Sequence, residues 1–402
     1  MILPIIDQKG KCSNVNVKAQ STPMDRKCQR VYLNECSSAM KLLHVLHSAP
    51  AADYKLTGEI RSAFRAECEV IELYLYKEKP AHFKGEGIFL NSTRNSFAPL
   101  SSAKEIAAVI KQEGITHVLS ERYKPSLLAA IAASRTGIKE VYSIFHGLDE
   151  FARLGRRIAA AFFMKNTRFI GVSASVRNDL VKNCPAAKER NSFTIFNGID
   201  LAGFHRDLLS KEAARAELGL KAERRIIGCV GRLVSLKGHD LLLAAVSRIP
   251  LDFDVAIVGE GRMMDELKKM AADLGLSERV VFTGNVTEAA RCLKAFDYFA
   301  MPSRKEGFGL AALEAILADV PIVSSDAGGL PEVLGGQGIM HKAGDTDGLT
   351  DGLKKLLSLD ESELKAYTDG LKKRSESMFS AGAMQQSYRN LILGNGNTIE
   401  LS

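Results

Sequence analysis

Two glutamates eight residues apart, Glu306 and Glu314, are the residues best suited to chemistry with a hydroxylated ligand. Gly307-Phe308-Gly309 lies between them. A carboxylate can accept hydrogen bonds from two hydroxyl groups, and glycines let backbone amides close on a ligand. Either acid alone would be typical of a residue that compensates a helix dipole. The pair with its glycines instead predicts a site for a polyol that carries a phosphate.

Two cations, Arg232 and Lys237, flank a loop between a predicted strand and the helix that follows it. Gly231 and Gly238 clear space around this loop. An exposed arginine and lysine are most often solvated charges, but a diphosphate needs two cations and the free amides of a helix start. The position of the pair therefore favours diphosphate binding.

The stretch from Met301 to Leu334 must position the two glutamates. A buried strand ends at Pro302, an apolar helix covers 309–317, a second strand covers 321–325, and Gly328-Gly329 opens a further helix. In an open α/β sheet, ligands bind where strands end and helices begin, because unpaired amides and the positive helix end meet there. The glutamates lie in such a place.

Strands alternate with helices along most of the chain, which predicts parallel pairing and doubly wound sheets. Length alone favours two domains for 402 residues. We expect a disordered extension at 1–39, a first domain at 40–205 and a second at 206–378, with Met40 as an alternative natural start. The predicted strands are 42–46, 69–75, 88–90, 118–119, 140–145, 169–173, 193–196, 226–231, 254–258, 280–283, 296–301 and 321–325. The main predicted helices are 102–112, 125–134, 211–218, 238–248, 262–274, 309–317 and 378–393.

Glu306-Gly307-Phe308-Gly309 followed by Leu313-Glu314-Ala315 resembles the Glu-x7-Glu signature of retaining GT-B glycosyltransferases of the GT4 group. The resemblance is close over 226–334 and weaker over 40–200. Other matching motifs, in the family's order, are Asn197-Gly198-Ile199-Asp200, Gly231-Arg232-Leu233 with Lys237-Gly238, Val258-Gly259-Glu260-Gly261, Phe282-Thr283-Gly284 and Asp326-Ala327-Gly328-Gly329.

The resemblance implies a GT-B fold, in which two Rossmann-like doubly wound domains face each other across a cleft and a C-terminal helix at about 379–396 packs back on the first domain. It implies a hexosyltransferase that moves a sugar from a nucleoside diphosphate sugar, expected to be a UDP-sugar, to a hydroxyl acceptor with retention. The expected setting is bacterial cell-envelope polysaccharide or lipopolysaccharide synthesis. The alternatives are a sugar-nucleotide-binding or scaffold protein without turnover, and a GT-B epimerase.

The resemblance also assigns roles to individual residues. Glu314 takes the ribose hydroxyls, Glu306 lies by the donor sugar, and Arg232 and Lys237 hold the diphosphate. His146, which follows the strand 140–145, lies by the donor sugar and its phosphate. The catalytic residues are then Glu306, His146, Arg232 and Lys237, and the donor-binding residues are Gly231, Arg232, Lys237, Gly284, Val286, Glu306, Gly307, Phe308, Gly309, Leu310 and Glu314.

We expect no metal and no other cofactor. Asp252-Phe253-Asp254 is formally a D-x-D pattern, but it precedes a strand, at the end opposite the expected site, and is interpreted as turn chemistry. Gly259-Glu260-Gly261 has Met264 where a dinucleotide fingerprint has its third glycine, which excludes an NAD site. The seven cysteines form no C-x-x-C, which argues against zinc and disulfides and for a reducing compartment.

The charges are divided unevenly along the chain. Residues 1–200 hold 29 Lys and Arg against 19 Asp and Glu, whereas the remainder holds 25 against 28. A basic half favours an anionic lipid surface or a phosphorylated, lipid-linked glycan acceptor. Aromatic residues are not interleaved with the charges, so nucleic acid is not an expected partner. No apolar run approaches the ~18 residues of a spanning helix, so we expect a cytoplasmic protein.

Three parts of the first domain leave alternatives open. Residues 151–165 form an amphipathic basic helix, for which a core-facing role is favoured; peripheral contact with the inner face of the plasma membrane is the alternative. Residues 48–55 replace the Gly-Gly turn of the family, and Lys55 with Gly58 could substitute in part. Glu121, Arg122 and Lys124 follow a strand, and a solvated loop is favoured there over acceptor contact.

Overall fold

The computed structural model describes residues 2–6, 12–16, 40–48, 55–76, 87–90, 99–250 and 252–394. The chain divides into two compact units, Met1–Met40 and Lys41–Ser402. In the first unit, strands β1 (Ile2–Ile6) and β2 (Cys12–Asn16) pair antiparallel. This pair was not anticipated. The rest of the predicted disordered extension lies outside the described residues, and its disorder stays a prediction.

The second unit contains a parallel sheet of seven strands in the order β5-β4-β3-β6-β7-β8-β9. Its central strands bury nearly every side chain, because helices cover both faces of the sheet. The strands are β3 (Lys41–Leu46), β4 (Glu69–Tyr74), β5 (Ile88–Phe89), β6 (His117–Glu121), β7 (Glu140–Phe145), β8 (Thr167–Gly171) and β9 (Ser192–Thr194).

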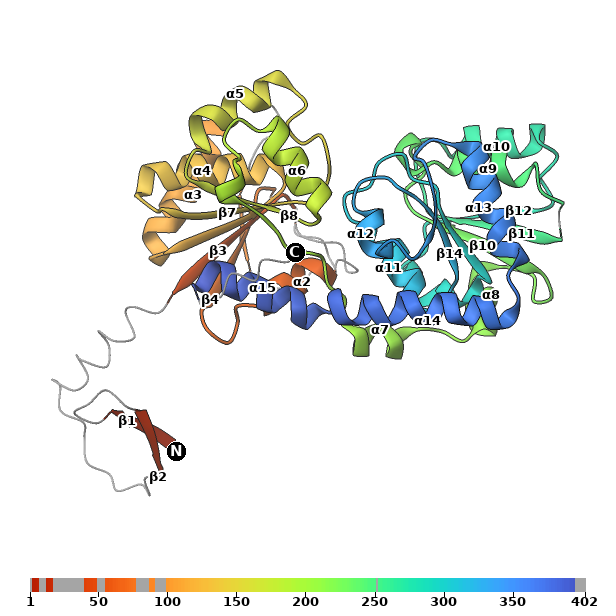
Figure 1. Ribbon diagram of the computed structural model, residues 1–402. Helices are drawn as coiled ribbons and strands as arrows, with labels where there is room; N and C mark the ends of the chain where they lie inside the picture. Colours follow the sequence, from red (N-terminus) through yellow and green to blue (C-terminus); the bar gives the residue numbers. More distant parts are fainter. Residues whose placement is uncertain are drawn as a thin grey trace. The chain divides into compact units, whose positions relative to one another are not determined.

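Helices α3 (Pro99–Glu113) and α4 (Tyr123–Thr136) pack on each other and on one face of this sheet (Figure 1). Their apolar side chains, among them Ile106 and Leu128, form a core with Val118 of β6. Helix α4 ends at Gly137, whose φ of 79° is accessible to glycine at little cost. The domain also contains α2 (Lys55–Ser62), α5 (Leu154–Phe163) and α6 (Ala174–Asn183).

A second parallel sheet of six strands has the order β12-β11-β10-β13-β14-β15. Its strands are β10 (Arg225–Val230), β11 (Phe253–Val258), β12 (Val280–Gly284), β13 (Tyr298–Met301), β14 (Ile322–Ser325) and β15 (Ile339–His341). In one group of helices, α9 (His239–Val246) contacts both α10 (Met264–Asp273) and α13 (Thr346–Ser358). A second group comprises α8 (Lys211–Leu218), the 3-10 helix η3 (Ala289–Ala295), α11 (Leu310–Leu317), α12 (Leu330–Leu334) and α14 (Glu361–Met378).

The last helix, α15 (Ala381–Leu393), leaves the second sheet and packs on α2 of the first (Figure 1). The Gln385 side chain donates to a Glu59 carboxylate oxygen at 2.9 Å, and Arg389 donates to the carbonyl of Ala63. Ile199 forms an isolated parallel bridge with Ser380 at the point where the chain returns. The chain end is therefore part of the first sheet's helical layer.

In each sheet the strand order reverses at one switch point. This point lies between β3 and β6 in the first sheet and between β10 and β13 in the second. The predicted fold class, α/β with two doubly wound parallel sheets, is confirmed. Ligands bind in such sheets at the carboxyl ends of the strands that flank the switch point. The predicted site residues Arg232 and Glu306 follow the two strands that flank the second switch point, β10 and β13.

Candidate active site

The loops after β10 and β13 bring two predicted site residues into contact. The Nζ of Lys237, at the end of the 3-10 helix η2 (Ser235–Lys237), donates to Oε2 of Glu306 at 2.6 Å. Ser303 donates to the same oxygen at 3.2 Å. The Lys237 and Glu306 side chains are 20% and 13% exposed, so solvent screens this ion pair only in part.

Two glycines allow the close approach of these loops. Gly238 has a φ of +70°, and a Cβ there would lie 2.0 Å from the carbonyl oxygen of Pro302. A Cβ on Gly307 would lie 1.9 Å from the carbonyl oxygen of His146. Neither position can carry a side chain without moving the backbone. The second contact also shows that the Glu306 loop touches the strand end that carries His146.

Arg232 is exposed, and its guanidinium makes no hydrogen bond or ion pair with any described residue. It lies beside Gly231, at the carboxyl end of β10. A guanidinium without a protein partner is free to bind a phosphate through two parallel hydrogen bonds. Arg232 and the Lys237–Glu306 pair therefore offer an anion one free cation and one shared cation.

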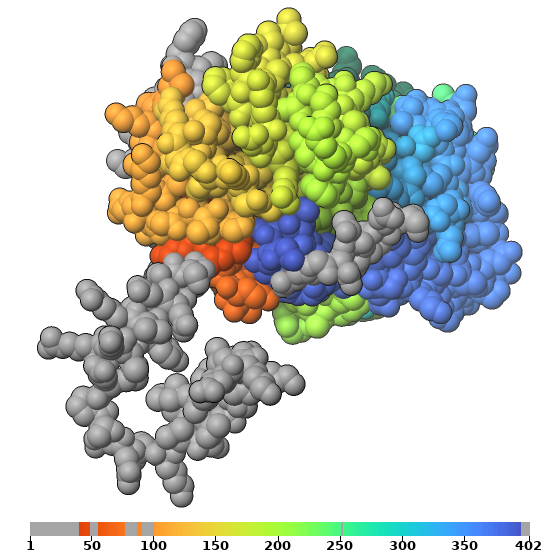
Figure 2. Space-filling model, turned by 60° about the vertical axis from the view of Figure 1, so that its left-hand side comes forward, coloured from red at the N-terminus to blue at the C-terminus, as the bar shows by residue number. Residues whose placement is uncertain are grey.

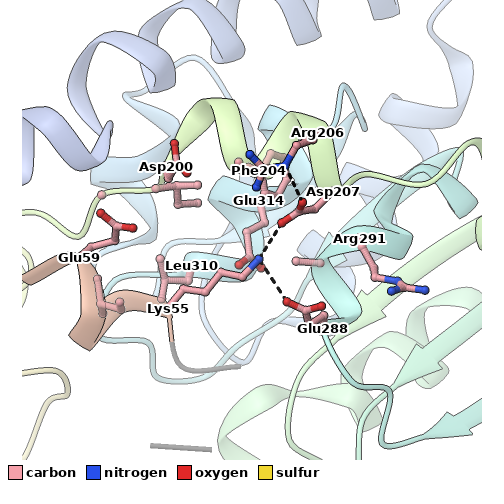
Figure 3. Close-up of a pocket in the computed structure, with 15 residues that line it drawn as sticks. Lys55, Glu59, Asp200, Phe204, Arg206, Asp207, Glu288, Arg291, Leu310 and Glu314 are labelled. Atoms are coloured by element: carbon pink, nitrogen blue, oxygen red, sulfur yellow. Dashed lines mark hydrogen bonds and ion pairs between the residues drawn. The ribbon is translucent and has the colours of Figure 1, made fainter. Parts of the chain in front are cut away.

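Glu314 lies on α11 and lines a pocket of about 320 Å³ (Figure 3). Its carboxylate makes no hydrogen bond with another described residue. Burial raises the pKa of this carboxyl to about 7, and the nearby cation Lys55 opposes the rise. An acid without a partner at the wall of a pocket is available to accept hydrogen bonds from ligand hydroxyl groups.

Other parts of the pocket wall come from α2, from the segment that joins the two sheets and from residues 288–291. Lys55 Nζ lies 3.0 Å from Oδ2 of Asp207 and 3.2 Å from Oε1 of Glu288 (Figure 3). Lys55 is therefore already neutralised by two acids. The remaining lining residues are Leu56, Glu59, Gly198, Ile199, Asp200, Gly203, Phe204, Arg206, Ala290, Arg291 and Leu310. Residues 49–54 of the turn before α2 lie outside the described residues.

Of the predicted donor-binding residues, Leu310 and Glu314 line this pocket. The others do not, namely Gly231, Arg232, Lys237, Gly284, Val286, Glu306, Gly307, Phe308 and Gly309. Glu288, two residues beyond Val286, does line it and was missed by the sequence reasoning. Its φ of 53° is unusual for a residue with a side chain. The side chain of Phe308 is buried between Phe196 and Phe379, so only its backbone remains for a ligand.

His146, Glu121 and His44 form a cluster at the carboxyl ends of β7 and β6 and within β3. The His146 Nε2 lies 2.9 Å from Oε2 of Glu121, and the His44 Nε2 lies 2.9 Å from Oε1. Burial acts to raise the pKa of Glu121, but the contacts with His146 and then His44 outweigh it and hold that pKa well below its ordinary value. The carboxylate is therefore ionised and hydrogen bonded to His146, whereas its close contact with His44 lacks hydrogen-bond geometry.

The solvated loop favoured for Glu121 is wrong, because β6 continues through Glu121 and leaves the residue 4% exposed. Lys124 is also engaged, since its Nζ donates to the Tyr76 hydroxyl at 2.9 Å. His44 was not singled out at all. The only signal for it is a histidine in an otherwise apolar strand, which is more often a packing residue.

Helix α6 of the first sheet is capped by a carboxylate from the second. The Ala174 and Ser175 amides donate to the two oxygens of Glu332 at 2.7 and 3.0 Å. Ser173, the N-cap residue, donates through its hydroxyl to the carbonyl of Gly307 at 2.6 Å. These bonds satisfy free amides at the positive helix end and tie α6 to the loop that carries Glu306.

No group of three His, Cys, Asp or Glu side chains that could hold a metal ion occurs among the described residues. The acids of the D-x-D pattern are paired with arginines. Asp254 contacts Arg224 at 3.2 Å and Arg279 at 3.0 Å, and Asp252 contacts Arg225. Both acids lie at the amino end of β11, away from the carboxyl strand ends.

Residues 210–373 match the model of the family described as Glycosyl transferases group 1. D-inositol 3-phosphate glycosyltransferase of Mycobacteroides abscessus is 38% identical over 40% of this chain and 38% of its own length. The lipopolysaccharide core biosynthesis mannosyltransferase LpsB of Rhizobium meliloti is 31% identical over 49% of this chain and 60% of its own length. Both matches therefore span less than two thirds of the relative.

A longer match joins this chain to the GDP-mannose-dependent α-(1-6)-phosphatidylinositol monomannoside mannosyltransferase of Mycolicibacterium smegmatis. The two are 29% identical over 70% of this chain and 78% of that protein. Among solved structures, Anabaena HepE in complex with UDP superposes with a TM-score of 0.73 and 18% identity, covering 88% of this chain and all of that chain. Sucrose-phosphate synthase from Thermosynechococcus elongatus superposes with a TM-score of 0.73 and 18% identity, over 89% of this chain and all of that chain.

The structural likeness concerns the fold, and the family match concerns the second sheet with its helices, where the Glu306 and Glu314 motif lies. The family match agrees with the family named from the sequence motifs, and the structural likeness agrees with the fold that those motifs imply. Residues 210–373 therefore match the glycosyl transferases group 1 family, within a chain that has the two-domain GT-B fold.

Proposed function

We propose that this protein is a hexosyltransferase that moves a sugar from a nucleoside diphosphate sugar to a hydroxyl group of a glycan or lipid-linked glycan, with retention of anomeric configuration. One observation carries the proposal. At the β10–β13 switch point, an unpartnered Arg232 and the Lys237–Glu306 pair adjoin the helix on which the unpartnered Glu314 lines a pocket. Cations for a diphosphate and an acid for a ribose are thus linked through the segment 306–314, although Arg232, Lys237 and Glu306 do not themselves line the pocket.

The names of the relatives support a role in bacterial glycolipid or lipopolysaccharide synthesis, because they include a phosphatidylinositol monomannoside mannosyltransferase and a lipopolysaccharide core mannosyltransferase. The same names leave two candidate nucleotides for the sugar donor, GDP and UDP. One relative is named as GDP-mannose-dependent, whereas the Anabaena protein was solved with UDP. The UDP-sugar expected from the sequence therefore stays a prediction, and GDP-mannose is its rival.

In the proposed reaction, the bond between the sugar C1 and the diphosphate oxygen breaks, and a bond from C1 to the acceptor oxygen forms on the same face. The acceptor proton passes to the departing phosphate oxygen. Negative charge grows on the diphosphate as the bond breaks, so Arg232 and Lys237 bind the transition state more strongly than the ground state. Because two cations and helix-end amides offset this charge, we infer that no metal ion takes part.

The test uses the full chain with UDP, GDP and their sugar conjugates. Thermal shift identifies the nucleotide, since a ligand that binds only the folded state stabilises it, and a transfer assay with radiolabelled donor then measures turnover in EDTA. We expect one nucleotide family to bind and its sugar to be transferred. Binding without turnover on any glycan or lipid-linked glycan would favour the scaffold alternative, and conversion of the donor without acceptor would favour the epimerase. Strict dependence on Mn²⁺ or Mg²⁺ would overturn the metal-free mechanism.

A further inference from the structure

Helix α5 carries a concentration of exposed apolar side chains. Among the described residues, seven large hydrophobic side chains are exposed, and four of them belong to this helix of ten residues. They are Leu154 at 69%, Ile158 at 50%, Phe162 at 69% and Phe163 at 45%. The core-facing role favoured for this helix is therefore wrong for these four side chains. Scattered exposed hydrophobics are ordinary, but a cluster on one helix indicates an interaction surface.

The helix is held to the domain by other residues. Ala160 on the helix is fully buried, and so are Phe151 before it and Met164 after it. Phe151 packs on Phe145 with ring centroids 5.4 Å apart and on Tyr123 at 5.6 Å. The four exposed side chains are thus not needed to attach α5, and the helix stands at the outside of the domain, uppermost in Figure 1 and in yellow at the top of Figure 2.

The charges carried by α5 and by its immediate flanks from 151 to 168 are all positive. Residues 151–168 contain no Asp or Glu. Arg153, Arg157 and Lys165 are exposed, and none of their charged groups forms an ion pair with a described residue. Arg156 differs, because it contacts Glu150 and lies 4.5 Å from the Tyr123 ring centroid. The surface is therefore apolar with unneutralised cations beside it.

Exposed apolar side chains beside unpaired cations could contact either a second copy of this chain or a lipid bilayer, and the charges distinguish the two. A second copy related by a two-fold axis would place the same basic residues opposite each other, in an interface whose core disfavours charge. An anionic bilayer instead accepts both groups, because apolar side chains enter the acyl boundary while arginine and lysine reach the lipid headgroups. Charge complementarity therefore favours lipid.

We propose that the α5 face, defined as Leu154, Ile158, Phe162 and Phe163 with Arg153, Arg157 and Lys165, docks on an anionic lipid bilayer. No helix among the described residues has the length and apolar character to cross a bilayer, so this contact is peripheral. His146 follows β7, in the loop that leads from that strand into α5. If the proposed function holds, docking brings the acceptor side of the reaction to the surface where a lipid-linked acceptor lies.

Vesicle sedimentation of the full chain tests the proposal. The vesicles are phosphatidylcholine alone, and equal parts of phosphatidylcholine and phosphatidylglycerol. We expect binding to the mixed vesicles that weakens as salt rises, and little binding to phosphatidylcholine. Replacing both Arg153 and Arg157 with Gln should weaken binding to the mixed vesicles by roughly fivefold for each charge removed. Equal binding of the wild type to both vesicles, or to neither, would overturn the proposal.

A second variant, Phe162→Ser with Leu154→Ser, removes two exposed apolar side chains and should reduce vesicle binding about tenfold or more. The matched control is Leu100→Ser, because Leu100 is 58% exposed on α3, away from the α5 face. The control should bind as the wild type does, and thermal unfolding should show all three proteins folded. Wild-type binding by the double variant would contradict the proposal, as would loss of a dimer in light scattering with vesicle binding unchanged.

Transfer to a water-soluble acceptor without vesicles separates this proposal from the proposed function. The α5 variants should keep that activity, since no α5 residue lines the pocket. Vesicle binding in a protein that transfers no sugar would leave the docking proposal intact and remove the enzyme. Sugar transfer by a protein that binds no vesicles would support the proposed function and overturn the docking proposal.

Discussion

The Nζ of Lys237 lies 2.6 Å from Oε2 of Glu306, so the cation predicted to hold a diphosphate is already paired with the acid predicted to lie by the donor sugar. A diphosphate that binds here must share Lys237 with Glu306 or displace the carboxylate. No described residue competes for Arg232 in this way. The two cations are therefore unequal before the donor arrives, although both act on the same leaving group in the proposed reaction.

Replacing Arg232 or Lys237 with Ala should slow transfer more than it weakens donor binding, because their partner is most negative in the transition state. Each lost charge-assisted contact should cost ~1.5 to 3 kcal/mol. The measurement is kcat from transfer assays beside Kd from calorimetry. Lys268→Ala on α10 is the control, since Lys268 is an exposed lysine that lies on a helix and not in the loop after β10. Normal turnover in both variants would remove the diphosphate assignment.

Glu306→Gln should have opposite effects on nucleotide binding and on turnover. Removing the carboxylate charge frees Lys237 for the diphosphate and removes a nearby repulsive charge, so the free nucleoside diphosphate should bind more tightly. Transfer should fall, because the acid beside the donor sugar is lost. Calorimetry with the nucleotide alone and a transfer assay together check the prediction. A weaker nucleotide complex would show that Glu306 assists phosphate binding rather than competing with it.

Much of the second sheet could be predicted from sequence because its signals are local. Apolar runs mark β10 and β13, the residues after each strand end face the switch point, and Glu306 and Glu314 are only eight residues apart. The same reasoning located the Gly238 loop. Fold class and the placement of these residues at strand ends therefore needed no long-range information.

Other parts of the site depend on partners that are distant in sequence. Glu121 is buried because His44 and His146 enclose it, and a charged residue just past a strand gives no sign of either partner. Glu332 caps a helix that begins 158 residues earlier. For α5, periodicity shows which side chains share a face but not whether another element covers that face. Sequence reasoning could not decide these cases, since each is a matter of tertiary packing.

Glu121→Gln tests whether the carboxylate positions His146. The amide keeps the shape but loses the charge that holds both imidazoles, so kcat should fall by an amount equivalent to ~1 to 3 kcal/mol while donor Kd changes little. Asp at the same position, which retains the charge, should restore part of kcat. If the Gln variant loses stability but keeps its full kcat when folded, Glu121 is a structural residue only.

The same variant should alter the pH dependence of stability. The pKa of Glu121 is lower in the folded state than its ordinary value of 4.5. At pH values between the folded-state pKa and 4.5, the folded protein therefore binds fewer protons than the unfolded chain. Its stabilising contribution is complete above about pH 4.5 and is lost as pH falls. Acid unfolding followed by circular dichroism should show a shallower loss of stability for Glu121→Gln. Parallel curves for both proteins would contradict the assignment.

Glu314 should make nucleotide binding depend on pH near neutrality. Burial raises its pKa to about 7, and only the ionised carboxylate accepts hydrogen bonds from both ribose hydroxyls. Donor affinity should therefore increase as pH rises through about 7, and Glu314→Gln should lose this dependence. Stability should behave in the opposite way. Because the folded state binds the extra proton, the wild type loses stability as pH rises from about 4.5 to about 7, whereas the Gln variant is spared that loss.

A 2′,3′-dideoxy nucleoside diphosphate decides whether Glu314 acts on the ribose. The wild type should bind this analogue more weakly than the normal nucleotide, because two hydrogen bonds to the carboxylate are missing. Glu314→Gln should scarcely distinguish the two ligands, since the charge that held those hydroxyls is gone, and the cycle of protein and ligand changes isolates the pairwise contribution. Calorimetry of all four combinations gives the coupling free energy directly. Equal discrimination by both proteins would make Glu314 a pocket-wall residue without ribose contact, and the nucleotide would then have to lie elsewhere along the β10–β13 switch point.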